Sequence, residues 1–84
     1  MGYEIGYSPR FEKSVKKLKK KDPPLYQQLR RKMEEIYDAP EHFKPLKKPE
    51  AGTRRAHVGS FVIKYVLRGD VIKILSFDHH DKAY

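Results

Sequence analysis

The apolar residues of this 84-residue chain follow a helical period in the first half of the sequence and alternate with polar residues in the second half. The helical stripe consists of Phe11, Val15 and Leu18, followed by Leu25, Leu29, Met33 and Ile36. From Thr53 onward the period is close to two, which is typical of strands with one buried face. A chain of this length supports one hydrophobic core, so helices and strands must bury their apolar faces against one another.

Proline and capping residues set the ends of the predicted helices. Ser8 can accept hydrogen bonds from free amides, and Pro9 suits the first helical position, so a helix is expected to start here. Asp22-Pro23-Pro24 ends this helix and caps the next one, which ends at Asp38-Ala39-Pro40. The short break between the two helices predicts an antiparallel hairpin. Residues 3–7, before the first helix, suit a short strand.

Three more strands are predicted, over Thr53–Val58, Phe61–Leu67 and Val71–Phe77, with turns at Gly59-Ser60 and Gly69-Asp70. The segment from Glu41 to Gly52 is rich in proline and lysine and is predicted to be a loop. The order is therefore strand, helix, helix and three strands, a single small α+β domain over residues 1–84. We expect the helical hairpin to pack on one face of an antiparallel sheet.

The alternation also predicts which side chains lie on the uncovered face of the sheet. Ala56 and Val58 share one side of their strand and are expected to face the helices. In the next strand the more apolar row, from Phe61 to Leu67, is expected to face the same way. The open face then carries Arg55, His57, Val62 and Lys64. Such a face, with cations and few acids, suits the binding of phosphate groups.

The chain is strongly basic, with 19 lysine and arginine residues, 11 aspartate and glutamate residues, and a net charge of +8. This excess favours a polyanionic partner: a nucleic acid, an acidic protein or a membrane surface. No apolar stretch approaches the roughly 20 residues of a membrane-spanning helix, and Met1-Gly2-Tyr3-Glu4 lacks a signal-peptide pattern. The lack of cysteine excludes disulfides and thiolate–zinc sites. We expect a soluble cytoplasmic protein that does not enter a membrane.

The end of the chain, from Phe77 to Tyr84, holds two imidazoles, two carboxylates, an ammonium group and a phenol. Three interpretations are open: a fraying polar tail, a metal site, and acid–base chemistry, for which imidazole is suited near neutral pH. The metal site is disfavoured because the side chains of the adjacent residues His79 and His80 are expected to diverge. Moreover, no third histidine or cysteine has the spacing of a ligand. We therefore expect neither a metal nor another cofactor.

Cleavage of RNA needs groups of these kinds and no metal. A base removes the proton of a 2′-hydroxyl, whose oxygen attacks the adjacent phosphorus. Cations stabilise the charge on the phosphate oxygens, and an acid protonates the departing 5′-oxygen. A structural role for Arg55, in an ion pair with Asp78 or Asp81, is the alternative to phosphate binding.

Two segments together resemble the RelE/ParE toxin superfamily of prokaryotic toxin–antitoxin systems, and specifically its RelE-like branch, which cleaves mRNA. Residues 54–65 are similar to the family's basic strand, glycine turn and aromatic-ended strand. Residues 79–84, His-His-Asp-Lys-Ala-Tyr, are similar to its terminal histidine–arginine–tyrosine signature. The resemblance implies a metal-independent endoribonuclease that acts on mRNA in the ribosomal A site. It also implies a cognate antitoxin protein that wraps around the toxin.

The resemblance also assigns roles to individual residues. The catalytic residues would be His79, His80, Tyr84 and Arg55. The residues that bind RNA and its phosphates would be His57, Lys64, Lys47 and Arg54. Arg55 and His57 match the family's basic strand residues, His79 matches the histidine of the terminal signature, and Tyr84 matches the tyrosine that stacks on a base or assists proton transfer.

The chain departs from the family pattern at two positions. Val62 stands where many RelE-like toxins have an arginine, so Lys64 or Lys47 would have to supply that charge, or the activity is weak. His80 stands where an arginine is common. Two other functions therefore stay open: a ParE-like inhibitor of DNA gyrase, and a non-catalytic module that binds RNA or the ribosome.

Overall fold

The computed structural model describes residues 2–43 and 52–83. Its elements are β1 (Glu4–Tyr7), α1 (Pro9–Lys21), α2 (Pro23–Asp38), β2 (Thr53–Val58), β3 (Phe61–Arg68), β4 (Val71–His79) and α3 (His80–Ala83). The predicted order of strands and helices is confirmed. Two features were not predicted: β4 extends to His79, and the short helix α3 follows it directly.

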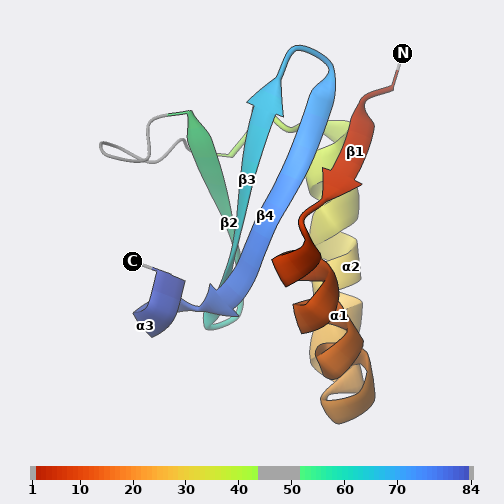
Figure 1. The fold of residues 1–84 in the computed structure, drawn as a ribbon, viewed down its shortest axis with the longest axis vertical. Coiled ribbons are helices and arrows are strands. Elements are labelled where there is room, and N and C mark those ends of the chain that lie inside the picture. Colours follow the sequence, from red (N-terminus) through yellow and green to blue (C-terminus); the bar gives the residue numbers. More distant parts are fainter. Residues whose placement is uncertain (1, 44–51, 84) are drawn as a thin grey trace.

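The strands form one sheet in the order β1-β4-β3-β2. The last three strands are antiparallel neighbours, as predicted. β1, however, pairs with β4 in parallel, with Glu4 opposite Val71 and Tyr7 opposite Ile74, so the sheet is mixed rather than wholly antiparallel. Alternation along β1 shows that one strand face is buried but carries no information on strand direction. The direction follows from the helical hairpin between β1 and β2, which returns the chain to the far edge of the sheet (Figure 1).

Both long helices lie on one face of the sheet, to the right of β2, β3 and β4 in Figure 1. The core between the two layers consists of Phe11, Leu29 and Ile36 from the helices and Ala56, Val58, Ile63, Tyr65, Ile72, Ile74 and Phe77 from the strands. Ala56, Val58 and the row from Phe61 to Leu67 thus face the helices, as the alternation predicts. None of the helices in residues 2–43 and 52–83 has the length and apolar character needed to cross a membrane.

The predicted caps and turns are present. The Ser8 hydroxyl accepts a hydrogen bond from the Phe11 amide (3.1 Å), and Asp22 accepts one from the Leu25 amide (3.2 Å). Gly59 and Gly69 both adopt a φ of +57°, a left-handed conformation that favours glycine in tight hairpin turns. Local sequence therefore determines where these elements start and turn.

Candidate functional site

A β-bulge in β4 decides which of its residues share a face. Tyr65 lies opposite Ile74, but the preceding residue Lys64 lies opposite Ser76, which leaves Leu75 as the extra residue. Because one inserted residue reverses the alternation, Phe77 lies on the same side of the sheet as Ile74. Residues 76 and 78 accordingly belong to the open face, and residues 77 and 79 to the face that carries the helices.

His79 is therefore on the helix side of the sheet, at its end. It lies opposite Phe61 in the register, and its ring meets the Phe61 ring edge-on with centroids 5.4 Å apart. Phe61 in turn stacks on Phe77 at 5.0 Å. The aromatic stack holds the imidazole in place while 39% of the His79 side chain stays exposed, so a substrate can reach it.

His80 begins α3 and is tied to the turn between β2 and β3. Its backbone N–H donates to the Ser60 carbonyl at 2.9 Å, and its ring Nδ1 lies 3.2 Å from the same oxygen. The two imidazole rings lie with centroids 4.6 Å apart. The expectation that adjacent histidines diverge is thus wrong for His79 and His80, because the chain changes from strand to helix between them.

Asp81 connects the two histidines. Its backbone N–H donates to His79 Nδ1 at 3.3 Å, and its carboxylate oxygens lie 3.5 Å from His79 Nδ1 and 3.0 Å from His80 Nε2. We call His79, His80 and Asp81 the terminal cluster. It contacts the ends of β3 and β4 and lies at the lower end of the sheet in Figure 1, away from the two long helices.

The predicted cations Arg55, His57 and Lys64 lie together on the open face. Arg55 is opposite Lys64, and His57 is opposite Val62, which in turn is opposite Asp78. Val62 is fully buried (0% exposed) although it faces away from the helices. The row His57–Val62–Asp78 is next to the row that ends in His79, but their side chains lie on opposite faces, so the basic open face and the terminal cluster meet around the end of the sheet.

One predicted phosphate ligand, Arg54, is not part of this face. Arg54 lies on the helix side, opposite Tyr65, and its guanidinium donates to the carbonyl oxygens of Glu41 (3.3 Å) and Phe43 (2.7 Å). Arg54 therefore braces the chain after α2. Lys47 and Tyr84 lie outside the described residues.

Arg10 was not predicted to be part of the site. It donates a hydrogen bond to the Asp78 carboxylate at 2.9 Å and so joins the first turn of α1 to the residue before His79. Asp78, one of the two carboxylates considered as a partner of Arg55, thus forms an ion pair with Arg10. No local pattern could indicate a pair separated by 68 positions.

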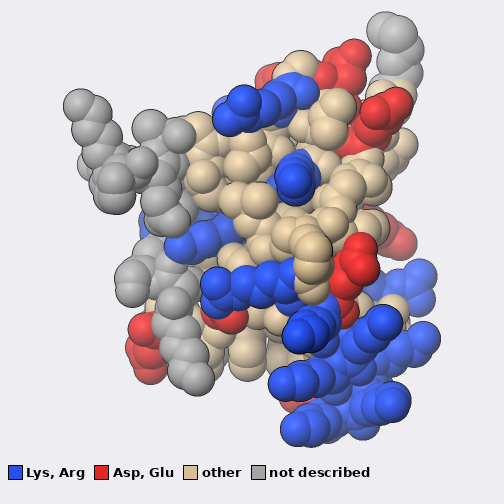
Figure 2. Space-filling view, viewed as in Figure 1, with Lys and Arg blue, Asp and Glu red and all other residues tan. Residues whose placement is uncertain are grey.

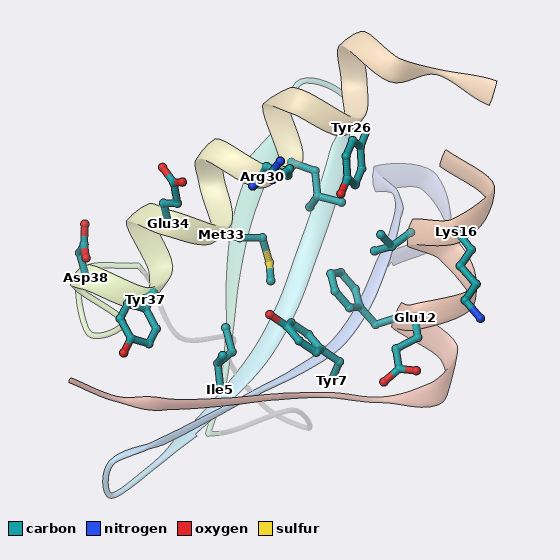
Figure 3. Close-up of a pocket in the computed structure, with 13 residues that line it drawn as sticks. Ile5, Tyr7, Glu12, Lys16, Tyr26, Arg30, Met33, Glu34, Tyr37 and Asp38 are labelled. Carbon is teal, nitrogen blue, oxygen red and sulfur yellow. The ribbon is translucent and has the colours of Figure 1, made fainter. Parts of the chain in front are cut away.

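A separate apolar groove of about 650 Å³ opens between β1, α1 and α2, away from the terminal cluster. In Figure 3, Tyr7 of β1 and Met33 of α2 point toward one another across it, and Ile5 and Tyr37 lie nearby. Tyr7 and Tyr37 are 44% and 39% exposed, which is high for large aromatic side chains. The groove suits an apolar polypeptide segment better than RNA.

On the face shown in Figure 2, the positive charge of the described residues is densest over α1 rather than over the sheet. Lysine and arginine side chains gather over the lower part of α1 in Figure 2. The last turn of α1 alone contributes Lys19, Lys20 and Lys21. This surface adds a long-range attraction for polyanions beside the basic open face.

Comparison with known proteins identifies the family. Residues 5–84 match the family described as the ParE toxin of type II toxin–antitoxin system, parDE. The chain belongs to this toxin family. A Methanocaldococcus jannaschii protein named as toxin RelE4 is 35% identical to the present chain over 85 residues. The alignment covers 98% of this chain and 90% of that protein. The resemblance to the RelE/ParE superfamily is thus confirmed.

Solved structures of other toxins have the same fold as the present chain. YafQ from E. coli strain BL21(DE3) superposes with a TM-score of 0.77 at 23% identity, covering 98% of both chains. A chain of the toxin–antitoxin complex RelBE2 from Mycobacterium tuberculosis gives a TM-score of 0.79 at 22% identity, covering 94% of this chain and 99% of that one. At these identities the similarity demonstrates a common architecture, two helices on a four-stranded mixed sheet.

Proposed function

We propose that this chain is an endoribonuclease toxin that cleaves mRNA, bound to the ribosome, by metal-independent acid–base attack of the 2′-hydroxyl. Residues 1–84 would act as one domain in the cytoplasm. The observation that carries this proposal is the position of two imidazole rings, 4.6 Å apart, at the end of a basic sheet face. Attack and departure take place at one phosphorus atom, so the base and the acid must lie close together.

The hydrogen bonds of the two histidines suit two different roles. His79 Nδ1 accepts a long hydrogen bond of 3.3 Å from the Asp81 N–H, so that nitrogen carries a lone pair, and it can act as the base once the substrate hydroxyl replaces the N–H there. The weaker 3.5 Å approach of the Asp81 carboxylate to the same atom does not reverse this assignment. His80 has an acceptor at each ring nitrogen, the Ser60 carbonyl and the Asp81 carboxylate. An imidazolium donates from both nitrogens, so His80 is the better acid.

The remaining proposed residues bind the substrate. Arg55, His57 and Lys64 would hold the phosphate on the open face, beside the terminal cluster. Tyr84 would stack on a base, and Lys47 would add a further phosphate contact. Arg54 is omitted from the proposed site because its guanidinium is already bonded to two backbone carbonyls.

We also propose that a cognate antitoxin binds this chain. Relatives of the same fold have been crystallised with a second protein, as in the E. coli DinJ–YafQ toxin–antitoxin complex. The net charge of +8 favours an acidic partner. An amphipathic segment of that partner could place its apolar side chains in the groove between Tyr7 and Met33.

Primer extension on ribosome-bound mRNA tests the cleavage. The native chain should cut the message, and His79→Gln and His80→Gln should each reduce cleavage by about 100-fold or more, the usual contribution of a positioned acid or base. His42→Gln is the matched control, since it removes an imidazole outside the terminal cluster. Cleavage by the native chain should persist with a chelator that removes transition-metal ions and leaves the Mg²⁺ of the ribosome in place.

Two results would argue against the proposal. If His79→Gln and His80→Gln cleave like the native chain, the terminal cluster is not the catalytic site. If the native chain leaves the message intact but inhibits DNA gyrase in a supercoiling assay, the ParE-like alternative is correct. Binding of RNA without cleavage would indicate the non-catalytic module.

A further inference from the structure

The terminal cluster presents three potential metal ligands on one small surface. His79, His80 and Asp81 each offer one ligand atom, and these atoms all lie within 4.8 Å of one another. The shortest separations are 3.0 Å, between His80 Nε2 and an Asp81 oxygen, and 3.5 Å, between His79 Nδ1 and the other Asp81 oxygen. Ligand atoms about 2.1 Å from a tetrahedral Zn²⁺ are separated by roughly 3.4 Å. These two separations are close to the spacing that a zinc ion requires, and the ion would replace the Asp81 N–H as the partner of His79 Nδ1.

The surroundings of His80 match those of a metal ligand. Its Nδ1 lies 3.2 Å from the Ser60 carbonyl, so a proton on Nδ1 leaves the lone pair of Nε2 free for a cation. Metal-bound histidines commonly donate their second ring N–H to a backbone carbonyl in this way. The Ser60 carbonyl also accepts the His80 backbone N–H at 2.9 Å, which fixes the residue relative to the turn.

The cluster is also accessible and supplies the right donor types. The exposed fractions of the side chains are 39% for His79, 51% for His80 and 74% for Asp81. Two imidazoles and one carboxylate suit zinc-like transition-metal ions, whereas magnesium and calcium prefer oxygen ligands throughout. A charge of −1 from Asp81 offsets part of the repulsion between a cation and this basic chain.

We propose that His79 Nδ1, His80 Nε2 and the Asp81 carboxylate bind one Zn²⁺ ion and that the bound ion inhibits cleavage. The inhibition rests on the proposed function, because the ion would occupy one nitrogen of each histidine that transfers a proton in the proposed cleavage. The binding itself does not depend on it. Water molecules would complete the coordination shell, since the described part of the chain brings no fourth side-chain ligand into this group.

Calorimetric titration of the full chain with ZnCl₂ tests the site directly. One ion should bind per chain, and His79→Gln, His80→Gln and Asp81→Asn should each weaken binding by about tenfold or more. His42→Gln should bind as the native chain does, and MgCl₂ should give no binding. NMR of the native chain should show the imidazole signals of His79 and His80 shifting together with added Zn²⁺, a measurement that needs no variant.

The site is disproved if the three variants bind Zn²⁺ as tightly as the native chain, or if His42 and His57 are the imidazoles whose signals shift. In the cleavage assay, one equivalent of Zn²⁺ should suppress the cutting of mRNA, and a chelator selective for Zn²⁺ over Mg²⁺ should restore it. Binding without suppression would overturn the inhibition alone. Because binding is measured without RNA, a chain that cleaves nothing would refute the proposed function while the titration still decides the metal site.

Discussion

Arg10, in the first turn of α1, and Asp78, near the end of β4, form an ion pair of 2.9 Å. The two residues are 68 positions apart in the sequence. The guanidinium side chain is 69% exposed, whereas the carboxylate is only 20% exposed. Asp78 directly precedes His79 in the strand. The pair therefore fixes the strand end that carries the terminal cluster to the helical layer.

We expect this ion pair to contribute more to positioning than to stability. Because Arg10 is largely exposed, the coupling free energy from a double-mutant cycle of Arg10→Gln and Asp78→Asn should be about 1 kcal/mol or less. Urea denaturation of the four proteins measures it. A coupling well above 2 kcal/mol would show that the pair is a main support of the fold.

Ser8 should matter more for stability than the similar cap at Asp22. The Ser8 hydroxyl accepts from the Phe11 amide and also donates to the Leu75 carbonyl at the bulge, whereas Asp22 caps α2 alone at an exposed position. We expect Ser8→Ala to lower the free energy of unfolding by about 2 kcal/mol and Asp22→Ala by about 1 kcal/mol or less. Equal losses in urea denaturation would show that the bond to Leu75 contributes nothing.

Ionisation of the Tyr65 hydroxyl should make the free energy of unfolding depend on pH in the alkaline range. Desolvation by burial raises the pKa of its hydroxyl from 10.0 to about 12, against a lowering by the nearby Arg54. The contribution of this pKa difference to stability is fully present below pH 10, where the hydroxyl is protonated in both the folded and the unfolded chain. Between pH 10 and about 12 the unfolded chain releases a proton that the native chain retains, so stability falls as the pH rises.

Tyr65→Phe separates this effect from the titration of other groups. The variant should lose about 1–3 kcal/mol near neutral pH, because the Pro40 carbonyl no longer receives the hydrogen bond of the buried hydroxyl. Above pH 10 its stability should fall less steeply than that of the native chain, by up to about 1.4 kcal/mol per pH unit. Parallel curves of unfolding free energy against pH would contradict the assignment to Tyr65.

The sequence was sufficient for the features that depend on neighbouring residues. Ser8-Pro9 and Asp22-Pro23 form the caps that were expected, and Gly59 and Gly69 form the turns. The alternation in β2 correctly placed Ala56 toward the helices and His57 toward the open face. Each of these outcomes follows from a steric or hydrogen-bonding preference within a few positions.

The features that escaped prediction depend on distant parts of the chain. The bulge at Leu75 moves His79 to the helix side of the sheet, and a single inserted residue leaves no mark in an apolar sequence. The parallel pairing of β1 and the Arg10–Asp78 contact join segments that are far apart. The convergence of His79 and His80 results from the start of α3 between them. The composition of the terminal cluster was therefore predictable, and its geometry was not.

The basic open face should give the main salt dependence of RNA binding. Arg55→Met and Lys64→Met each remove one cation from the face, so each should lower the slope of log affinity against log salt by about 0.7, the value for a single strand. Lys20→Met, on the lysine-rich surface of α1, is the matched control and should lower the slope by less than either, because that surface attracts RNA at long range without contacting a phosphate. Affinity for a short single-stranded RNA at several salt concentrations measures all three. A larger effect of Lys20→Met would move the RNA site to α1.

The substitution Val62→Arg tests whether this position can accept the arginine that the family resemblance suggests for it. Val62 is fully buried between His57 and Asp78, so an arginine must displace packed neighbours before its charge can reach water. We expect Val62→Arg to lower the free energy of unfolding by about 2 kcal/mol or more, and cleavage not to increase. Val62→Met is the matched control, because it adds a long side chain without charge.

The two Val62 variants separate steric cost from charge. If Val62→Met is destabilised as much as Val62→Arg, the loss comes from overpacking; if it is destabilised less, the remainder is the cost of placing a charge at this position. Urea denaturation and primer extension on the same protein preparations give both quantities. A Val62→Arg variant that is as stable as the native chain and cleaves faster would show that the position accepts a cation. The activity of this chain would then be limited by the missing arginine, and the histidines of the terminal cluster would not compensate for it.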